Sequence, residues 1–386
     1  MAFSYQALRN DEVRLLEVRS SNPPALEFTV RHYPRQTVPS YVAISYTWGE
    51  SPATEEIILD GQHFPVRPNL WSCLHHMQRC PEWSLIWIDA VCIDQSNIRE
   101  RNDQVRVMDE IYTRAETVVA WLGHEDESAD CSHVPEAVAS ELKYWDEEYH
   151  IRYFDLVNRP YWTRRWVVQE LSLARSIVFL CGQQRIPWDD LQAPFYVSSD
   201  GSGKYSGGKG GMWYKRVELQ PYAKAYTHML DRSWSNSGNL LHQLVRDYSH
   251  TECRDPRDRV FALLSLVKPR DRKSLETWFP DYTMNEETVQ SIALAHSLHA
   301  SRLEKSFLGR IIYGLVGKED ILTWQSVWRA AVAFYCSSEF AAHDHGGPLV
   351  TDGTIEGVRR LSDEIEASWE DPVFLTGKRL IDEPTA

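Results

Sequence analysis

Short apolar runs bounded by polar residues recur through the first half of the chain. Four of them lie near residues 43–46, 85–89, 117–122 and 177–181, and runs of this length are typical of buried strands. An apolar stripe with helical spacing separates the second run from the third. The sequence therefore predicts a βαβ unit with parallel strands. We expect it within an open, mostly parallel α/β sheet flanked by helices, Rossmann-like or flavodoxin-like in plan.

The pattern around these runs predicts the other elements of the core. A strand is expected at 26–30, and an alternating stretch at 57–66, interrupted by an Asp-Gly pair, predicts a β-hairpin insertion. Thr163 is the expected N-cap of a helix over about 164–175, because a Thr hydroxyl can accept a hydrogen bond from the first turn.

The composition changes after the last predicted strand. Residues 198–211 are rich in Gly and Ser, which predicts a flexible insertion. They include a G-x-x-x-x-G-K pattern, but Gly210 follows where a phosphate-binding loop needs Ser or Thr, so the flexible insertion is the preferred interpretation. Helical patterns then predict an extension over 212–305 that packs on the core. The C-terminal region, 306–386, has no role that we can assign from the sequence.

Composition narrows the class of protein. The chain has 386 residues, of which 43% are hydrophobic, enough for a substantial core. A net charge of −14 argues against broad nucleic-acid binding, and the apolar runs are too short for a membrane span. Seven scattered Cys without a C-x-x-C pair are typical of a reducing compartment, so we expect a soluble, cytoplasmic protein. His343-Asp344-His345 lacks a partner set with ligand spacing, and we expect no metal.

Polar and aromatic residues follow the first two predicted central strands. Ligands of α/β sheets lie beyond the carboxyl ends of the strands, so these residues form the candidate binding site. They are Ser45, Tyr46, Trp48 and Gly49 after the first strand, and Asp89, Cys92, Asp94 and Gln95 after the second.

Three motifs stand in order along this half of the chain. They are Y-x-A-I-S-Y-x-W-G at 41–49, W-I-D-A-x-C-I-D-Q at 87–95 followed by E-R-x-x-Q-V-x-x-M-x-x-I-Y, and R-x-W-V-x-Q-E-L at 164–171. Together they closely resemble the fungal heterokaryon-incompatibility (HET) domain. The resemblance implies a HET domain over 1–197, with its α/β core at about 41–182. It also implies a role in self/non-self recognition and programmed cell death.

The HET domain in turn resembles the Toll/interleukin-receptor (TIR) domain. Ser45-Tyr46 matches the Ser-Tyr pair that ends the first TIR strand, and Asp89 matches the Asp that ends the second. Trp166, Glu170 and Leu171 match a W-x-x-x-E-L arrangement whose Glu is catalytic in TIR enzymes that hydrolyse NAD. The resemblance therefore implies a TIR-like NAD glycohydrolase with Glu170 as catalytic residue.

The resemblance also sets expectations for ligands and partners. NAD or a related nucleotide would be a substrate rather than a permanently bound cofactor, and the chain would form a homo-oligomer on activation. A protein partner in incompatibility signalling is a further expectation. Arg101, Arg164 or Arg165 would face the pyrophosphate of NAD, and Tyr46, Trp48 or Trp166 would stack on a base.

Structural interpretations of the same residues remain open. Glu170 could close an ion pair with a nearby Arg, Asp89 could cap a turn, and Cys92 could be a buried thiol. The chain also departs from the TIR pattern, since Arg165 precedes the Trp and Val167 follows it where a small residue and a Cys are usual. A non-catalytic scaffold that acts by assembly, or a sensor that binds a nucleotide without cleaving it, therefore stands beside the enzyme hypothesis.

Overall fold

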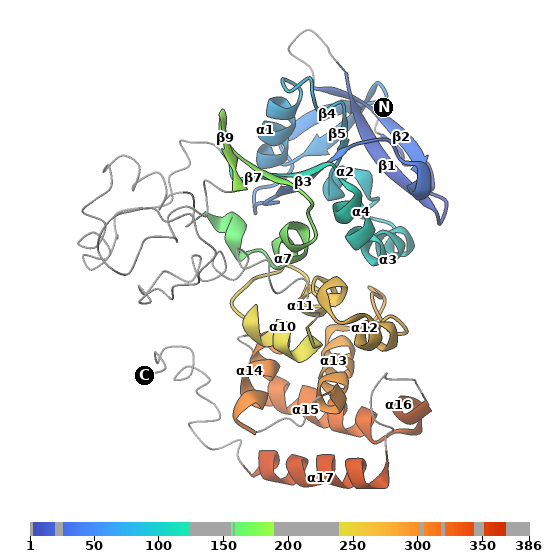
Figure 1. Ribbon diagram of the computed structural model, residues 1–386, viewed down its shortest axis with the longest axis vertical. Coiled ribbons are helices and arrows are strands. Elements are labelled where there is room, and N and C mark those ends of the chain that lie inside the picture. Colours follow the sequence, from blue (N-terminus) through green and yellow to red (C-terminus); the bar gives the residue numbers. More distant parts are fainter. Residues whose placement is uncertain are drawn as a thin grey trace, which may run out of the picture. The chain divides into compact units, whose positions relative to one another are not determined.

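A computed structural model describes residues 3–19, 26–123, 156, 159–188, 239–300, 305–317, 321–342 and 351–367 (Figure 1). The chain divides into two compact units, residues 1–230 and 231–386, and each is described by itself. Several expected features lie outside the described residues. They are the Gly/Ser-rich insertion at 198–211, the start of the helical extension that follows it, and His343-Asp344-His345.

The described part of the first unit contains a nine-stranded sheet. Its strands stand in the order β5-β4-β2-β1-β6-β3-β7-β8-β9. Its strands are β1 (Glu12–Val18), β2 (Glu27–Pro34), β3 (Val42–Tyr46), β4 (Glu55–Leu59), β5 (Gln62–Val66), β6 (Leu85–Trp87), β7 (Thr117–Trp121), β8 (Ile177–Cys181) and β9 (Gln184–Pro187).

The four predicted buried strands form the parallel centre of this sheet. β3 pairs in parallel with β6 on one side and β7 on the other, and β7 pairs in parallel with β8. All five residues of β3 and all five of β7 are buried. Numbered along the chain, the central strands therefore stand in the order 2-1-3-4. The predicted βαβ unit is confirmed, although β3 lies between its two strands.

The sheet as a whole is mixed, so the prediction of a mostly parallel sheet is wrong. β1 pairs antiparallel with both β2 and β6, and hairpins close the two edges. β1 has Arg14 and Glu17 among its apolar residues, so it lacks the uninterrupted apolar run that predicts the four central strands. The predicted hairpin at 57–66 is confirmed as β4 and β5. Its turn residues Asp60 and Gly61 have φ of 49° and 76°, which an Asp-Gly pair tolerates.

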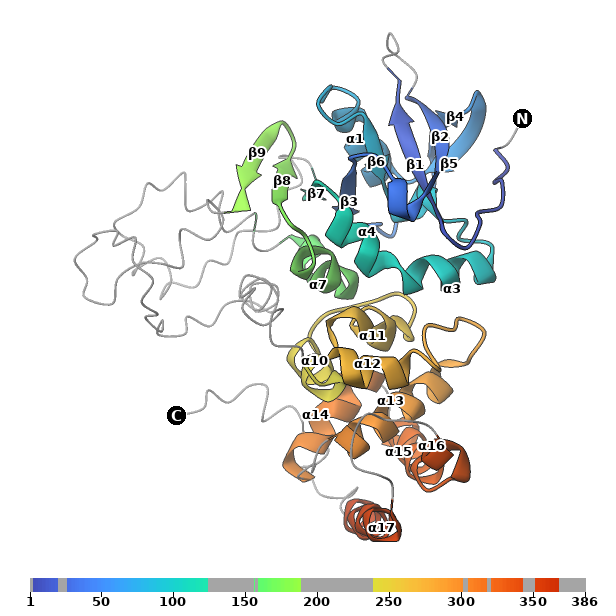
Figure 2. The same ribbon diagram turned by 45° about the vertical axis from the view of Figure 1, so that its right-hand side comes forward.

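Helices cover both faces of the parallel centre. α1 lies on one face, and α3, α4 and α7 lie on the other (Figures 1 and 2). The α-helices in the described part of this unit are α1 (Pro68–Met77), α2 (Asp89–Cys92), α3 (Ile98–Arg106), α4 (Met108–Arg114) and α7 (Arg165–Ser172). Asn97 caps α3, since its side chain accepts a hydrogen bond from the Glu100 N–H.

The start of α7 differs from the prediction. Thr163 ends a 3₁₀ turn, Pro160–Thr163, and its hydroxyl donates to the Pro160 carbonyl at 2.7 Å. The hydroxyl therefore does not cap α7, which begins at Arg165 with Arg164 in the N-cap position. This shift places Arg164 in extended backbone at the edge of the candidate site.

The second unit is helical. Its described residues include the helices α10 (Leu241–Asp247), α11 (Asp258–Phe261), α12 (Pro269–Leu275), α13 (Glu286–Ala300), α14 (Lys305–Val316), α15 (Ile321–Tyr335), α16 (Ser338–Ala342) and α17 (Asp352–Glu366). α13 is buried at every position from Val289 to Leu298 and is the centre of this unit. Gly314 lets α14 approach α10, because a Cβ there would lie 2.4 Å from the Val245 carbonyl oxygen.

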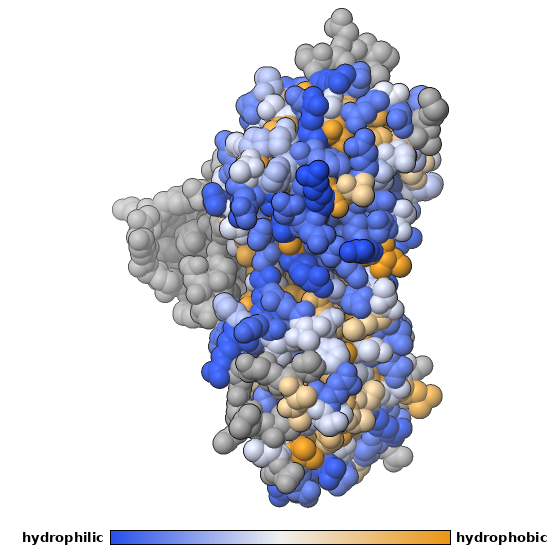
Figure 3. All heavy atoms as spheres, turned by 90° about the vertical axis from the view of Figure 1, so that its right-hand side faces the viewer, coloured by the Kyte–Doolittle hydropathy of each residue, from blue (hydrophilic) through white to orange (hydrophobic). Residues whose placement is uncertain are grey.

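Few large hydrophobic side chains are exposed among the described residues. On the face drawn in Figure 3, the sheet unit is largely hydrophilic with scattered apolar residues. Ile98 and Leu322 are the exposed large hydrophobic side chains of the described residues. Among the helices of those residues, none combines the length and the apolar character that a membrane crossing needs.

Candidate functional site

Glu170 lies at the centre of a buried cluster of hydroxyl groups. It projects from α7 and is 1% exposed. Ser45, one residue before the end of β3, donates a hydrogen bond from Oγ to Glu170 Oε2. The same Oγ shares a hydrogen bond of 2.7 Å with the hydroxyl of Tyr161. Tyr112 of α4 donates from its hydroxyl to the Ile44 carbonyl oxygen at 3.4 Å, and it favours the ionised form of Glu170. The predicted pair of Ser45 and Glu170 is therefore in direct contact.

Arg164 brings a positive charge to this cluster. Its Nη1 donates to the carbonyl oxygen of Tyr46 and lies 4.0 Å from Glu170 Oε2. The Arg164 side chain is 17% exposed, compared with 2% for that of Glu170. The guanidinium group has five N–H donors, so Arg164 is the member of the cluster best suited to meet an anionic ligand.

Asp89 is a second acidic group whose charge interacts with that of Arg164. It follows β6 and opens α2, where its Oδ1 accepts a hydrogen bond from the next backbone N–H, that of Ala90, at 2.7 Å. Its Oδ2 accepts from the indole Nε1 of Trp48 at 3.0 Å. Gln95 Nε2 donates to the Asp89 carbonyl oxygen at 2.9 Å. The Asp89 side chain therefore contacts the backbone of Ala90 and the indole of Trp48, while Ile88 occupies the N-cap position of α2.

One guanidinium group faces two acidic side chains in this site. Burial raises the pKa of Glu170 to about 7. The charge of Arg164 opposes that shift, and the charge of Asp89 adds to it. Burial also raises the pKa of Asp89, against the charge of Arg164 and the indole hydrogen bond of Trp48. A carboxyl group that titrates near neutral pH can change its protonation state during a reaction or on binding of a ligand.

The remaining loop residues have mainly structural contacts. Cys92 is completely buried, and burial raises the pKa of its thiol to about 12, so it is a core thiol rather than a nucleophile. Asp94 Oδ1 accepts hydrogen bonds from both N–H and Oγ of Ser96, which is an Asx turn. The Gly49 carbonyl accepts from Arg67, and Gly49 has φ of 70°.

The positions of the arginines refine the expectation for anion binding. Arg165 is completely buried, and Arg101 is half-buried on α3. Arg164, one residue before Arg165, is the arginine that approaches Glu170. Trp166 is half-buried and precedes Glu170 by four residues on α7, a spacing that places both on one side of the helix.

Sequence reasoning missed two members of the cluster. Tyr112 belongs to the apolar stripe of α4, where its ring lies 5.4 Å from that of Trp87, so its hydroxyl carried no separate signal. Tyr161 lies in the 3₁₀ turn that precedes α7. A hydroxyl on an otherwise apolar stripe that faces the end of β3 was the available clue, since a buried Tyr hydroxyl needs a polar partner.

Comparison with known proteins gives the family of this region. Residues 41–170 match the family model described as "Heterokaryon incompatibility protein (HET)". These residues form a HET domain. The HET match begins just before β3 and ends at Glu170.

A curated relative carries the same name. The chain is 30% identical over 244 residues to "Heterokaryon incompatibility protein 6, OR allele" of Neurospora crassa. The similarity covers 47% of this chain and 35% of the relative, so the chain spans about a third of the length of the curated relative that it matches. No solved structure matches the chain.

Proposed function

We propose that this chain is a fungal HET-domain effector of self/non-self recognition and programmed cell death, which acts in the cytoplasm by hydrolysing NAD to nicotinamide and ADP-ribose products. The family match and the name of the Neurospora relative support the first part of this proposal. The second part rests on the site in the α/β unit, with Glu170 as catalytic residue.

The observation that carries the proposal is the convergence of Ser45, Glu170 and Arg164 at the carboxyl end of β3. The four central strands of the sheet follow the order 2-1-3-4, as in flavodoxin-like sheets. Ligands of such sheets bind where the strand order reverses. This order and the position of the Glu also support a TIR-like core. A buried carboxyl group with a raised pKa in such a place is a candidate reacting group.

Hydrolysis of NAD needs few groups besides the side chains of this site and water. Cleavage of the nicotinamide–ribose bond develops positive charge on the ribose, and ionised Glu170 stabilises that charge. Arg164 offers N–H donors to the pyrophosphate, and the indole of Trp48 offers a face for stacking. Nicotinamide leaves as a neutral molecule, and water completes the hydrolysis.

The burial of Glu170 sets a condition on this activity. At 1% exposure, the carboxyl group is covered by its own neighbours, so NAD reaches it only after the loops at the carboxyl end of β3 rearrange. We propose that assembly into a homo-oligomer, prompted by a partner in incompatibility signalling, supplies this rearrangement. A single dilute chain is then silent.

The same burial favours a second candidate function. A carboxyl group that is covered by Ser45, Tyr112 and Arg164 is also what a purely structural network needs. In that case the HET domain is a non-catalytic module that signals by assembly. A related non-catalytic function is that of a sensor, which binds NAD without cleaving it.

Incubation of concentrated protein with NAD separates these functions. Wild type is expected to release free nicotinamide, and Glu170→Ala and Glu170→Gln are expected to release none while remaining folded. Glu116→Gln, a change at an exposed Glu that contacts Ser40, is the matched control and keeps full activity. No release by folded wild type at any concentration would favour assembly without catalysis, and release that survives both Glu170 variants would place the reaction elsewhere.

A further inference from the structure

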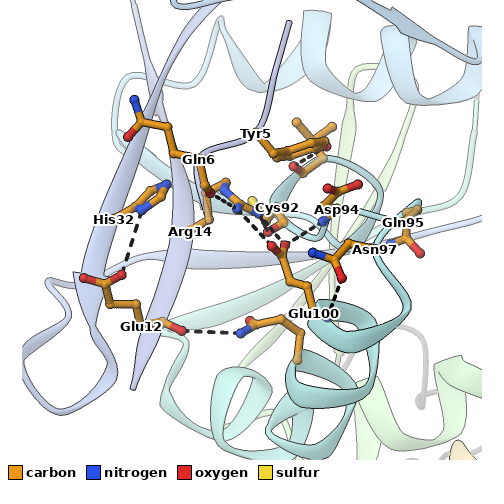
Figure 4. Close-up of polar contacts among 12 residues, drawn as sticks. Tyr5, Gln6, Glu12, Arg14, His32, Cys92, Asp94, Gln95, Asn97 and Glu100 are labelled. Atoms are coloured by element: carbon orange, nitrogen blue, oxygen red, sulfur yellow. Dashed lines mark hydrogen bonds and ion pairs between the residues drawn. The ribbon is translucent and has the colours of Figure 1, made fainter. Parts of the chain in front are cut away.

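The N-terminal strand contributes a buried arginine beside the candidate site. Arg14 of β1 is 0% exposed, and it lies outside the residues that match the HET family. Its guanidinium reaches the loop after β6, where Nη1 donates to the Cys92 carbonyl oxygen at 2.7 Å (Figure 4). The charge of Arg14 is paired by Glu100 of α3, with Nη1–Oε1 and Nη2–Oε2 distances of 2.8 and 3.4 Å.

Glu100 also contacts the backbone two residues after Cys92. Its Oε1 also accepts a hydrogen bond from the Asp94 backbone N–H at 2.7 Å. Its own N–H donates to the Asn97 side chain, so Glu100 stands in the first turn of α3. Arg14 and Glu100 together therefore hold the backbone on both sides of Ile93.

Tyr5, in the N-terminal segment, makes a further contact with α2. Its hydroxyl donates to the Val91 carbonyl oxygen at 3.0 Å, and the Arg14 guanidinium lies over its ring, 4.7 Å from the centroid (Figure 4). The last two carbonyl groups of α2, those of Val91 and Cys92, therefore receive their hydrogen bonds from the first 14 residues of the chain. Carbonyl groups at a helix end have no partner within the helix, so these contacts fix where α2 ends.

α2 is four residues long, and its first residue is Asp89. An element so short keeps its direction only if both ends are held. Trp48 holds the Asp89 side chain at one end, and Arg14 and Tyr5 hold the carbonyl groups at the other end.

We propose that Arg14, paired with Glu100, is a positioning residue that sets the place of Asp89 and of the Trp48 indole in the candidate site. Its guanidinium touches neither Asp89 nor a ligand, and it acts through α2. A lysine cannot replace it, because an ammonium group lacks the planar fork that serves Cys92 and Glu100 together. The residues that match the HET family then need the β1–β2 hairpin of this chain for an ordered site.

The test uses the full chain with both charges removed together, as Arg14→Met combined with Glu100→Leu. Single removal leaves a buried charge, whereas replacement of the pair by apolar side chains leaves no charge and removes only the partners of the Cys92 carbonyl and the Asp94 N–H. Arg31→Met combined with Glu17→Leu is the matched control, because that pair lies in the same hairpin at 2.8 Å but is about half exposed. The readout is the indole ¹H–¹⁵N signal of Trp48, assigned with Trp48→Phe.

The double variant at Arg14 and Glu100 is expected to remain folded, with an unfolding transition of the same shape as that measured for wild type. Its Trp48 signal shifts toward that of a solvent-exposed indole, while the indole signal of Trp328, in the second unit, is unchanged. The control pair leaves the Trp48 signal in place. A folded double variant with an unchanged Trp48 signal would overturn the proposal, as would an equal shift in the control.

A second readout rests on the proposed function. If wild type releases nicotinamide, the double variant at Arg14 and Glu100 is expected to lose on the order of 10²-fold in kcat, the cost of displacing a site by about 1 Å. Unchanged kcat would overturn the positioning role. If wild type releases none, the hydrolase proposal fails, and the Trp48 signal still decides the role of Arg14.

Discussion

Two buried glutamates of the sheet unit are surrounded in opposite ways. Glu100 meets the guanidinium of Arg14 through both of its oxygens and accepts a backbone N–H as well. Glu170 meets hydroxyl groups, and its nearest cation, Arg164, is 4.0 Å away and shared with Asp89. Both side chains are less than 10% exposed, so burial alone does not distinguish them.

The difference lies in how the charge is compensated. The ion pair of Arg14 and Glu100 is bidentate and hydrogen-bonded, which is the arrangement of a structural contact. Among the described residues, Arg164 is the guanidinium that acts on both Glu170 and Asp89, and burial raises the pKa of Glu170 to about 7. Under-compensated carboxyl groups are typical of functional sites, because their protonation state responds to a ligand.

Removal of one partner from the compensated region has the largest expected effect. Arg14→Met leaves Glu100 as a buried carboxylate without its cation, which lowers the free energy of unfolding by about 3–5 kcal/mol at pH 7. Chemical denaturation measures this value. The double variant with Glu100→Leu is expected to recover part of the loss, because the buried charge is gone while the Cys92 carbonyl and the Asp94 N–H still lack their partners. Additive losses would contradict the pairing.

Unlike Arg14→Met, Glu170→Gln is expected to raise the free energy of unfolding relative to wild type as the pH rises. The pKa of Glu170 is raised from 4.5 to about 7 in the folded chain, so folded protein binds the proton more tightly than unfolded protein does. The stability from this group is complete below pH 4.5 and is lost as the pH rises through 7. Gln has no such loss.

The difference in unfolding free energy between Glu170→Gln and wild type is therefore expected to grow by about 3 kcal/mol between pH 4.5 and pH 8 in favour of the variant. Denaturation curves of both proteins across this range give the value. A constant difference would show that Glu170 has an ordinary pKa.

Ser45→Ala removes the hydrogen bond that favours the ionised form of Glu170. The pKa of Glu170 is expected to rise further, and the free energy of unfolding at pH 8 is expected to fall by about 1.5–3 kcal/mol. Carboxyl ¹³C chemical shifts, followed through a pH titration, report the first change, and denaturation reports the second. An unchanged titration would show that Ser45 does not support the carboxylate.

Asp89→Asn has the smallest expected effect. The negative charge of Asp89 raises the pKa of Glu170, so its loss lowers that pKa by less than about one unit. The same ¹³C titration detects the change. Asp247→Asn, in the second unit and beside Arg246, is the control that leaves the Glu170 titration unchanged.

Much of this molecule was predictable from local pattern. The central strands were found because they contain short apolar runs, such as residues 118–121 of β7. β1 was missed because Arg14 interrupts its apolar residues, and an Arg in a strand is usually solvated. Its partner, Glu100, stands 86 residues further along the chain, and no local pattern links the two.

The candidate site also has residues that the sequence predicts and residues that it does not. Glu170, Ser45 and Asp89 were found because each belongs to a motif. The choice between Arg164 and Arg165 depends on where α7 begins, and the hydroxyl of Thr163 moves that start by one residue. Single residues at helix ends are the least predictable part of a sequence.

The rate of nicotinamide release as a function of pH tests the role of Glu170 most directly. If ionised Glu170 is the reacting group, kcat/KM for NAD rises as the pH passes through about 7. The midpoint of that rise falls in Asp89→Asn, and Glu170→Gln has no activity at any pH. A rate that is constant from pH 5.5 to 8.5, or a midpoint that Asp89→Asn leaves unchanged, would contradict the assignment of Glu170.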